Sequence, residues 1–375
     1  MGDENNPAAK FQAGKCFGKF KIVRKLDQGG FGHVYLVEHK EDKSMQAALK
    51  AEPNDVEGGS AIKLEISVLR GLNKDGSKSH IPLVMHAAKH AKFSYMIMTL
   101  LGENLKNLKL ECRGELMSAG TWSRIGIQCL AAIKQVHDFG YVHRDIKPNN
   151  FVMGHKEDME RARMVHILDF GLSRAYAFKS IKDPTKWVAR RARGSAEFRG
   201  TLRYCSPTVH ERLEQGRKDD LWSLFYVLIE LHCGLPWQTV RGKKKIELMK
   251  MQMPDAVLCL NFPKEMHKIV PYLRTLDCYS RPDYTIFYDG LIGVMKSRKV
   301  KWSDPYDWEQ KNMERLKKVL DAQKKPPTWE DLTTFFKDDP LGIDKAPTID
   351  NEEWRELVTE EPSKTSKSQT QYTKE

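Results

Sequence analysis

The chain lacks the cysteine spacing of a zinc site or of a disulfide-stabilised fold. Its seven cysteines are an odd number, they are scattered over 375 residues, and none form a Cys-x-x-Cys pair. Structural zinc sites and secreted disulfide frameworks need clustered or evenly paired cysteines. We therefore expect reduced thiols and a cytoplasmic location, with the nucleus as the other candidate compartment.

Long apolar runs are also missing. The first ten residues, MGDENNPAAK, contain no apolar core of a secretory signal. Gly2 invites comparison with an N-myristoylation motif, but Asn6 stands where that motif requires Ser or Thr. No apolar stretch approaches the roughly 20 residues of a membrane-spanning helix, so we expect no membrane partner.

Charge is distributed unevenly along the chain. The net charge is +12, but residues 326–375 hold 6 Lys or Arg against 12 Asp or Glu, which leaves +18 on the rest. A basic body favours an acidic partner, such as a phosphopeptide, a nucleic acid or an anionic lipid. No motif with interleaved aromatic residues supports nucleic-acid binding. We expect a monomer without a nucleic-acid partner.

The residues that are present are organised around positions 143–151, which read HRDIKPNNF. Asp145 is placed to accept a proton from an attacking hydroxyl, and Lys147 can reach a transferring phosphate. Asn150 brings an amide oxygen to a metal ion. An acid, a cation and a neutral metal ligand this close together are what phosphoryl transfer requires of one loop. The stretch matches the protein-kinase catalytic loop H-R-D-L-x-x-x-N, with Ile in place of Leu.

A glycine-rich turn joins two predicted strands near the N-terminus. Its residues, 27–33, read DQGGFGH, and apolar runs flank it on both sides. Glycine lets backbone N–H groups approach nucleotide phosphates, although many hairpins carry such turns, so this evidence is weak alone. The kinase pattern G-x-G-x-x-G-x-V maps onto Asp27, Gly29, Gly32 and Val34, with Asp27 in place of the first glycine.

A charged residue in an apolar strand links the next two predicted elements. Residues 45–51, MQAALKA, predict a strand in which Lys50 needs a partner for its charge. Apolar residues at helical spacing over 62–70 predict a helix with Glu65 beside its apolar face. Glu65 is therefore the candidate partner. This pair resembles the kinase lysine–glutamate pair that holds the α- and β-phosphates.

Two further aspartates lie at informative positions. Residues 165–172, VHILDFGL, place Asp169 after a strand-like run, where it matches the D-F-G aspartate and offers a hard oxygen ligand to Mg²⁺.

Residues 219–230 predict a helix that is apolar nearly all round and hence buried. Asp220, near its start, is placed to accept N–H bonds from the catalytic loop. Another helix is predicted over 122–137.

These motifs occur in protein-kinase order and spacing over roughly residues 18–296. The stretches GTLRY at 200–204, GLPW at 234–237 and KPNNF at 147–151 resemble the casein kinase I superfamily. FRGT at 198–201 and DDLWSLFY at 219–226 are most similar to its tau-tubulin kinase branch. As in that superfamily, the Glu of the usual A-P-E motif is absent. Arg281 is the customary partner of that Glu and therefore needs a different partner.

The resemblance implies an α+β, bilobal protein-kinase fold with a small β-rich N-lobe (18–98), a hinge (99–101) and a larger, mainly helical C-lobe (102–296). It implies a serine/threonine protein kinase that uses ATP and Mg²⁺. The catalytic residues would be Asp145, Lys147 and Lys50, and the metal ligands Asn150 and Asp169. The nucleotide-binding residues would be Asp27, Gly29, Gly30, Gly32, Val34, Ala48, Lys50, Glu65, Met98, Thr99, Leu101 and Val152, with hinge amides on adenine.

Three regions lie outside this domain. Residues 1–17 read as a flexible lead-in, and residues 297–325 as a C-terminal extension with aromatic residues that could pack on the body. Residues 326–375 read as an acidic, largely disordered tail, since their last part has no apolar periodicity.

Basic residues also suggest a substrate preference. Residues 179–203 contain eight Lys or Arg, and Lys243, Lys244 and Lys245 follow the buried helix in an expected loop. Phosphate and carboxylate groups on a peptide would be drawn to such charges. We predict acidic or already phosphorylated protein substrates, docked by Arg203 and the three lysines. The competing interpretation is a solvated basic surface with no docking role.

Two other function classes compete with an active protein kinase. A pseudokinase scaffold is favoured slightly by Asp27 in the glycine turn and by the missing A-P-E glutamate. A small-molecule or lipid kinase would also use an Asp and an Asn in a short loop, but DFG and DDLWSL favour a protein acceptor. Because all five chemistry positions are intact, we favour the active protein kinase.

Overall fold

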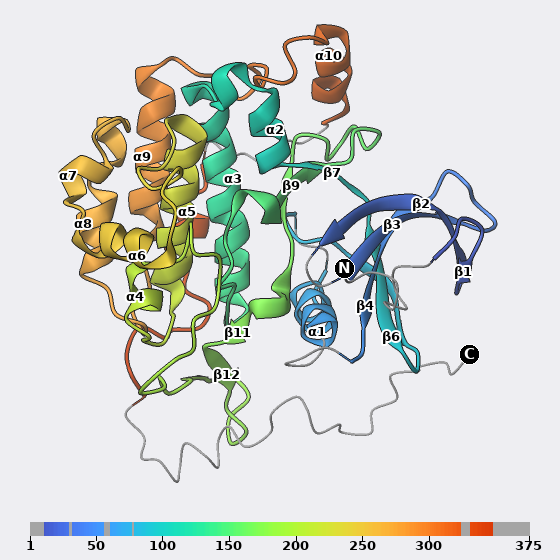
Figure 1. Cartoon of the computed structure of the whole chain (residues 1–375), viewed down its shortest axis with the longest axis horizontal. Coiled ribbons are helices and arrows are strands. Elements are labelled where there is room, and N and C mark those ends of the chain that lie inside the picture. Colours follow the sequence, from blue (N-terminus) through green and yellow to red (C-terminus); the bar gives the residue numbers. More distant parts are fainter. Residues whose placement is uncertain (1–10, 30–31, 56–60, 77–78, 324–330, 348–375) are drawn as a thin grey trace.

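The computed structural model describes residues 11–29, 32–55, 61–76, 79–323 and 331–347. They form two lobes, a strand-rich one at the N-terminus and a helical one that follows it (Figure 1). This is the predicted α+β arrangement. Within these residues, no helix is both long enough and apolar enough to span a membrane.

The N-lobe is built on one antiparallel sheet of six strands in the order β1-β2-β3-β4-β6-β5. One helix, α1 (Ile62–Leu72), packs against it, close to the predicted bounds. The strands are β1 (Cys16–Phe17), β2 (Phe20–Gly29), β3 (Gly32–His39), β4 (Gln46–Pro53), β5 (Val84–Lys89) and β6 (Phe93–Thr99).

Side-chain alternation gives this sheet two different faces. Tyr35, Leu49 and Ile97 lie on the outer face, in a small core of their own. Phe11 and Phe17 cover that face, with Phe11 4.9 Å from the Phe17 ring and 5.4 Å from Tyr35. The prediction of a flexible lead-in over 1–17 is therefore wrong for residues 11–17, because two aromatic rings anchor them to the sheet.

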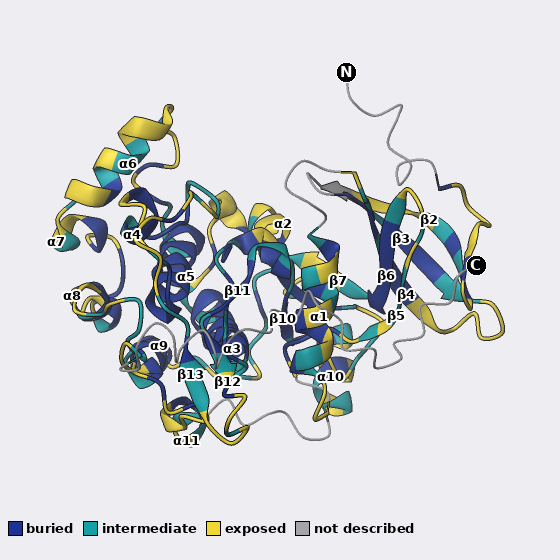
Figure 2. Ribbon diagram, turned by 90° about the horizontal axis from the view of Figure 1, so that it is seen from below, coloured by how far each residue is buried: buried dark blue, intermediate teal, exposed yellow. Residues whose placement is uncertain are grey.

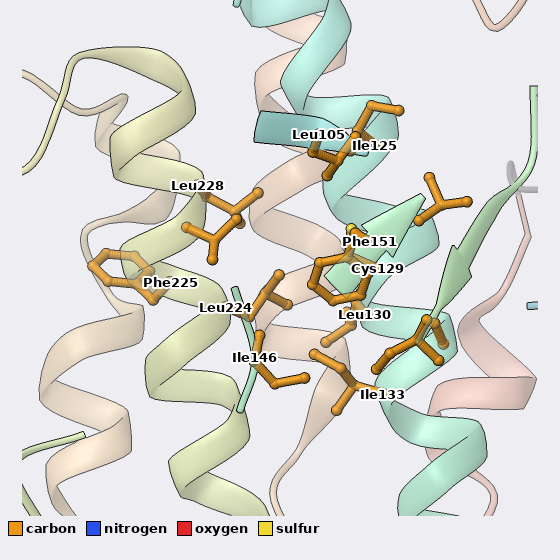
Figure 3. Close-up of a cluster of buried hydrophobic side chains, with 14 of the residues drawn as sticks. Leu105, Ile125, Cys129, Leu130, Ile133, Ile146, Phe151, Leu224, Phe225 and Leu228 are labelled. Atoms are coloured by element: carbon orange, nitrogen blue, oxygen red, sulfur yellow. The ribbon is translucent and has the colours of Figure 1, made fainter. Parts of the chain in front are cut away.

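The C-lobe is organised around two long helices, α3 (Ala119–Asp138) and α5 (Arg217–His232). Figure 3 shows Leu224 and Leu228 of α5 facing Leu130 and Ile133 of α3 in the hydrophobic core. The other helices are α2 (Leu105–Glu111), α4 (Pro207–His210), α6 (Lys243–Gln252), α7 (Asp255–Leu258), α8 (Ile269–Arg274) and α9 (Tyr284–Ser297). The buried α5 agrees with the sequence prediction.

Short strands hold in position the loops that lie between the two lobes. One three-stranded sheet, in the order β10-β9-β7, combines β7 (Leu101–Asn104), β9 (Phe151–Gly154) and β10 (Val165–Ile167). A two-stranded pair joins β8 (Tyr141–Val142) to β11 (Arg174–Ala175). A hairpin joins β12 (Ala177–Lys179) to β13 (Trp187–Ala189). These pairings hold both ends of the loop that follows α3.

The C-terminal regions pack on the helical lobe. Tyr306 is buried beside Trp308, as the aromatic pattern suggested, and α10 (Met313–Ala322) follows. Residues 331–347 contain α11 (Thr333–Lys337), which lies beside α9 (Figure 2). The prediction of a largely disordered tail over 326–375 is therefore corrected for residues 331–347.

Candidate active site

Lys50 and Glu65 form the ion pair that the sequence suggested. Lys50 lies in the middle of β4, and its Nζ is 2.6 Å from a Glu65 carboxylate oxygen on α1. Glu52, two residues along the strand, is 3.3 Å from the same Nζ. Burial lowers the pKa of Lys50, but the charges of Glu65, Asp169 and Glu52 outweigh burial and raise it above its ordinary value. Lys50 is therefore a fixed cation.

Asp169 completes this charged cluster from the other lobe. Its backbone is left-handed, with φ of 68°, at the start of a short 3₁₀ turn over Phe170–Leu172. The bend brings the Asp169 carboxylate to 3.8 Å from Lys50 Nζ. Burial raises its pKa, but the interactions with Lys50, His143 and Lys147 together outweigh burial and hold the pKa below its usual range. Asp169 is therefore an ionised oxygen donor.

Asp145 lies at the centre of a second cluster. Lys147 Nζ is 2.5 Å from one Asp145 carboxylate oxygen, and Thr201 Oγ1 donates to the other at 2.7 Å. Asn150 Nδ2 donates to the Asp145 carbonyl at 2.8 Å, which fixes the amide and leaves its oxygen as an acceptor. The catalytic loop thus holds its acid, its cation and its amide in one rigid arrangement.

Asp220 clamps the catalytic loop from the start of α5. Its carboxylate accepts the backbone N–H of His143 at 2.7 Å and that of Arg144 at 2.8 Å. His137 of α3 contacts the same carboxylate at 2.9 Å. The structure therefore shows the positional role that the sequence suggested for Asp220. The clamp matters because Arg144 has a strained positive φ of 68°.

The candidate adenine-binding side chains share the inner face of the N-lobe sheet. Val34 of β3 is the register partner of Lys50, and Ala48 of β4 is the register partner of Met98 of β6. Because opposite residues of an antiparallel pair share a face, Val34, Ala48 and Met98 lie on the same face of the sheet as Lys50. Val152 lies in β9 of the other lobe and is buried.

The hinge and the glycine turn differ in part from the prediction. Thr99 donates its N–H to the Leu83 carbonyl at 3.0 Å, so that amide is not available to adenine, and this expectation is corrected. Leu101 begins β7 and is half-buried. Asp27 is exposed opposite Val34, and Gly29 pairs with Gly32 at the end of the hairpin. Gly30 lies outside the described residues.

Gly32 is required by the close approach of the neighbouring strand. A Cβ at this position would lie 2.3 Å from the Ala51 carbonyl oxygen of the adjacent strand. No side chain fits at that distance. Part of the glycine pattern is therefore explained by close strand packing.

Asn150 and Asp169 could hold a magnesium ion together with phosphates. Mg²⁺ commonly takes one or two protein oxygens and completes its shell with water and substrate phosphates. In the part of the chain that the structure describes, no group of three His, Cys, Asp or Glu residues is arranged to bind a metal alone. This donor set suits a metal that arrives with a nucleotide better than a permanent metal centre.

Arg203 does not have the free charge that was predicted for docking. Its Nη1 is 2.8 Å from the Glu230 carboxylate, and its Nη2 donates to the Gln238 carbonyl at 3.1 Å. Glu230 is 5% exposed. The Arg203 charge is therefore largely used to neutralise a buried carboxylate on α5.

The three lysines also differ from expectation, because they lie in a helix rather than in a loop. Lys243, Lys244 and Lys245 form the exposed first turn of α6. Lys243 Nζ lies 4.5 Å from the ring centroid of Phe198. Phe198 is close in sequence to Thr201, whose hydroxyl contacts Asp145. Positive side chains at a helix N-terminus add to the positive end of the helix dipole, which favours a bound anion there.

Sequence reasoning missed three residues of this site. Thr201 touches Asp145, Glu52 touches Lys50, and Lys250 donates to the carbonyls of Leu202 and Cys205 at 2.7 Å each. Glu52 is two residues from Lys50 on the same strand face, so strand alternation could have indicated it. Lys250 gave no local signal, because its partners lie about 45 residues away.

Comparison with known proteins agrees with this geometry. The model of the protein kinase domain matches residues 20–304. The chain belongs to the protein kinase family. This kinase is 44% identical to a putative serine/threonine-protein kinase of Caenorhabditis elegans over 300 residues, covering 80% of this chain and 84% of that protein.

Two other relatives come from the predicted superfamily, one of them from its predicted tau-tubulin kinase branch. An inactive tau-tubulin kinase of Caenorhabditis elegans is 42% identical over 76% of this kinase and 97% of the relative. A putative casein kinase I of the same organism is 31% identical over 78% of this kinase and 83% of the relative. The predicted kinase fold and branch are confirmed, while one relative is inactive by name.

Proposed function

We propose that this chain is an active serine/threonine protein kinase that uses ATP and Mg²⁺. The observation that carries the proposal is the simultaneous presence of both charged clusters. Lys50 pairs with Glu65 at 2.6 Å while Asp145 is held by Lys147 and Thr201. Protein kinases need the Lys–Glu pair and the D-F-G aspartate in place together for transfer.

Each residue has a chemical task in this proposal. Asp145 accepts the proton of the acceptor hydroxyl and orients that oxygen. Lys50 and Lys147 neutralise phosphate charge from opposite lobes, which is the electrostatic stabilisation that phosphoryl transfer mainly needs. Asn150 and Asp169 are the protein ligands of the metal. The bound MgATP supplies the phosphoryl group and the remaining metal ligands.

Acidic or phosphorylated acceptors are proposed as preferred substrates. The exposed lysines of α6, with Lys243 beside Phe198, support this proposal. Arg203 is no longer a leading contact, because Glu230 neutralises it. The docking surface is therefore residues 243–245 alone.

A catalytically inactive scaffold is the second candidate. The relative that is named inactive, with 42% identity, favours it. Asp27, exposed opposite Val34 in the glycine turn, would place a carboxylate near the nucleotide. The intact charged residues of both clusters argue against an inactive scaffold.

One experiment separates the two candidates. Transfer from γ-labelled ATP to a peptide library should be measured for wild type, Asp145→Asn and Lys50→Met, with nucleotide binding measured calorimetrically. We expect Asp145→Asn to bind MgATP like wild type and to transfer at least about 100-fold more slowly. Wild type that binds MgATP but phosphorylates no peptide would establish the scaffold instead.

Location and assembly remain proposals of the same kind. All seven cysteines are free thiols, which supports a reducing cytoplasmic or nuclear compartment. We propose that the kinase works as a monomer on protein substrates.

A further inference from the structure

Residues 331–345, which we name the C-terminal strap, are anchored to the helical lobe by an aromatic residue. Phe336 of α11 is fully buried, 5.1 Å from the Tyr288 ring and 6.5 Å from the Tyr284 ring. Lys134 Nζ lies 4.6 Å from the ring centroid of Phe335, in a cation–π contact. The strap is therefore docked through a specific apolar contact on α9 and α3.

Arg281 is the polar anchor of the strap. Its Nη2 donates to the carbonyls of Phe336, Lys337 and Asp338 at 3.0, 3.1 and 2.7 Å. These carbonyls end α11, and the last carbonyls of a helix lack partners within it. The strap thus supplies Arg281 with the partner that the missing A-P-E glutamate would otherwise provide.

The other end of the strap reaches the segment that follows Asp169. Leu341 and Ile343 pack with Ala177 of β12 and Ala189 of β13 in one small core. The Ile343 carbonyl accepts a hydrogen bond from Arg217 at the start of α5. The strap therefore connects α9, α5 and the β12–β13 hairpin.

That hairpin is linked to the catalytic loop through the segment that precedes it, residues 172–175. β11, just before it, pairs with β8, and Val142 of β8 immediately precedes His143. Arg144 Nε donates to the Leu172 carbonyl at 2.7 Å. A shift of the hairpin would therefore be transmitted to the loop that carries Asp145.

We propose that the strap is a positioning element of the active site, which holds residues 174–192 in the place that phosphoryl transfer requires. The inference rests on the proposed kinase activity. Its structural basis is that Arg281, Arg217 and the hairpin core are all contacted by a segment outside the matched kinase domain, which ends at residue 304.

The test uses full-length variants and two readouts. Phe336→Ala should loosen the strap, and the milder pair Leu341→Ser with Ile343→Ser should release only its far end. Leu316→Ala is the matched control, because Leu316 is a buried residue of α10, a C-terminal helix outside the strap. Amide hydrogen exchange and steady-state phosphorylation should be measured for each.

We expect exchange at 174–192 to become at least about tenfold faster in both strap variants and to stay unchanged in the control. kcat should fall about tenfold, with the KM for ATP unchanged. Unchanged exchange at 174–192 in folded strap variants would overturn the proposal. If wild type transferred no phosphate, the exchange readout would still test the strap, so the two failures are distinguishable.

Discussion

Glu214 binds the guanidinium of Arg193 through both carboxylate oxygens, at 2.6 Å from Nε and 3.0 Å from Nη2. Arg174 Nε lies 3.3 Å from the same carboxylate. Burial raises the pKa of Glu214, but both arginines outweigh burial and hold it below its usual range. A permanent carboxylate therefore lies among the basic residues that surround Arg144.

This arrangement predicts activity without phosphorylation of residues 172–200, because Glu214 already supplies the negative charge. Ser173 and Ser180 are buried, which further disfavours their modification. Phosphatase treatment should leave kcat unchanged, whereas Glu214→Gln should lower it about tenfold by freeing the arginines. Activity that is lost on dephosphorylation and regained when this segment is rephosphorylated would contradict the prediction.

Thr201 should contribute to catalysis through its hydrogen bond to Asp145. Thr201→Val keeps the shape but removes the donor, so we expect kcat to fall about tenfold through loss of Asp145 orientation. Thr201→Ser keeps the hydroxyl and should remain near wild type. The measurement is steady-state phosphorylation, with the KM for ATP expected to be unchanged in both. Equal losses in the two variants would exclude the hydroxyl as the cause.

The lysines of α6 and Arg203 should behave differently. Replacing residues 243–245 by Ala should raise the KM for acidic peptides up to about tenfold and leave neutral peptides unaffected, since exposed charges contribute modestly. Added salt should mimic the substitution. Peptide kinetics at low and high salt measure both effects.

Arg203→Ala is the comparison, because it leaves the buried Glu230 carboxylate without its cationic partner and with the Tyr204 hydroxyl as its remaining donor. We expect a lower melting temperature and similar losses on acidic and neutral peptides. A selective loss on acidic peptides from Arg203→Ala, with none from the lysine variant, would reverse this assignment.

Lys250 should make stability depend on pH in the alkaline range. Burial lowers its pKa from 10.5 to about 8. A base with a lowered folded pKa binds fewer protons when folded than when unfolded, so its contribution to stability rises between about pH 8 and 10.5 and is lowest below pH 8.

The measurement is urea unfolding of wild type and Lys250→Met at two pH values. From about pH 7.5 to 9.5, the free energy of unfolding of wild type should rise relative to the variant by about 2 kcal/mol. Titrating groups that do not interact with Lys250 cancel in this difference. A constant difference would show that Lys250 keeps its ordinary pKa.

The sequence alone determined the chemistry of the site and the fold that carries it. Asp145, Lys147 and Asn150 lie within six residues, so local spacing was enough to define the loop. Lys50 and Glu65 could be paired because a charge in an apolar strand demands a partner. Asp220 could be placed because its helix is visibly buried and follows the loop in order.

Only the tertiary structure decided which charges are free and which segments are docked. Arg203 and Arg193 look like exposed docking groups until Glu230 and Glu214 are brought beside them. The strap was predicted to be disordered because it belongs to an acidic tail whose last part has no apolar periodicity, yet Phe336 and Arg281 hold it. These contacts join residues far apart in the chain, and no local pattern encodes them, because they form only when the helices and loops of the C-lobe have packed together.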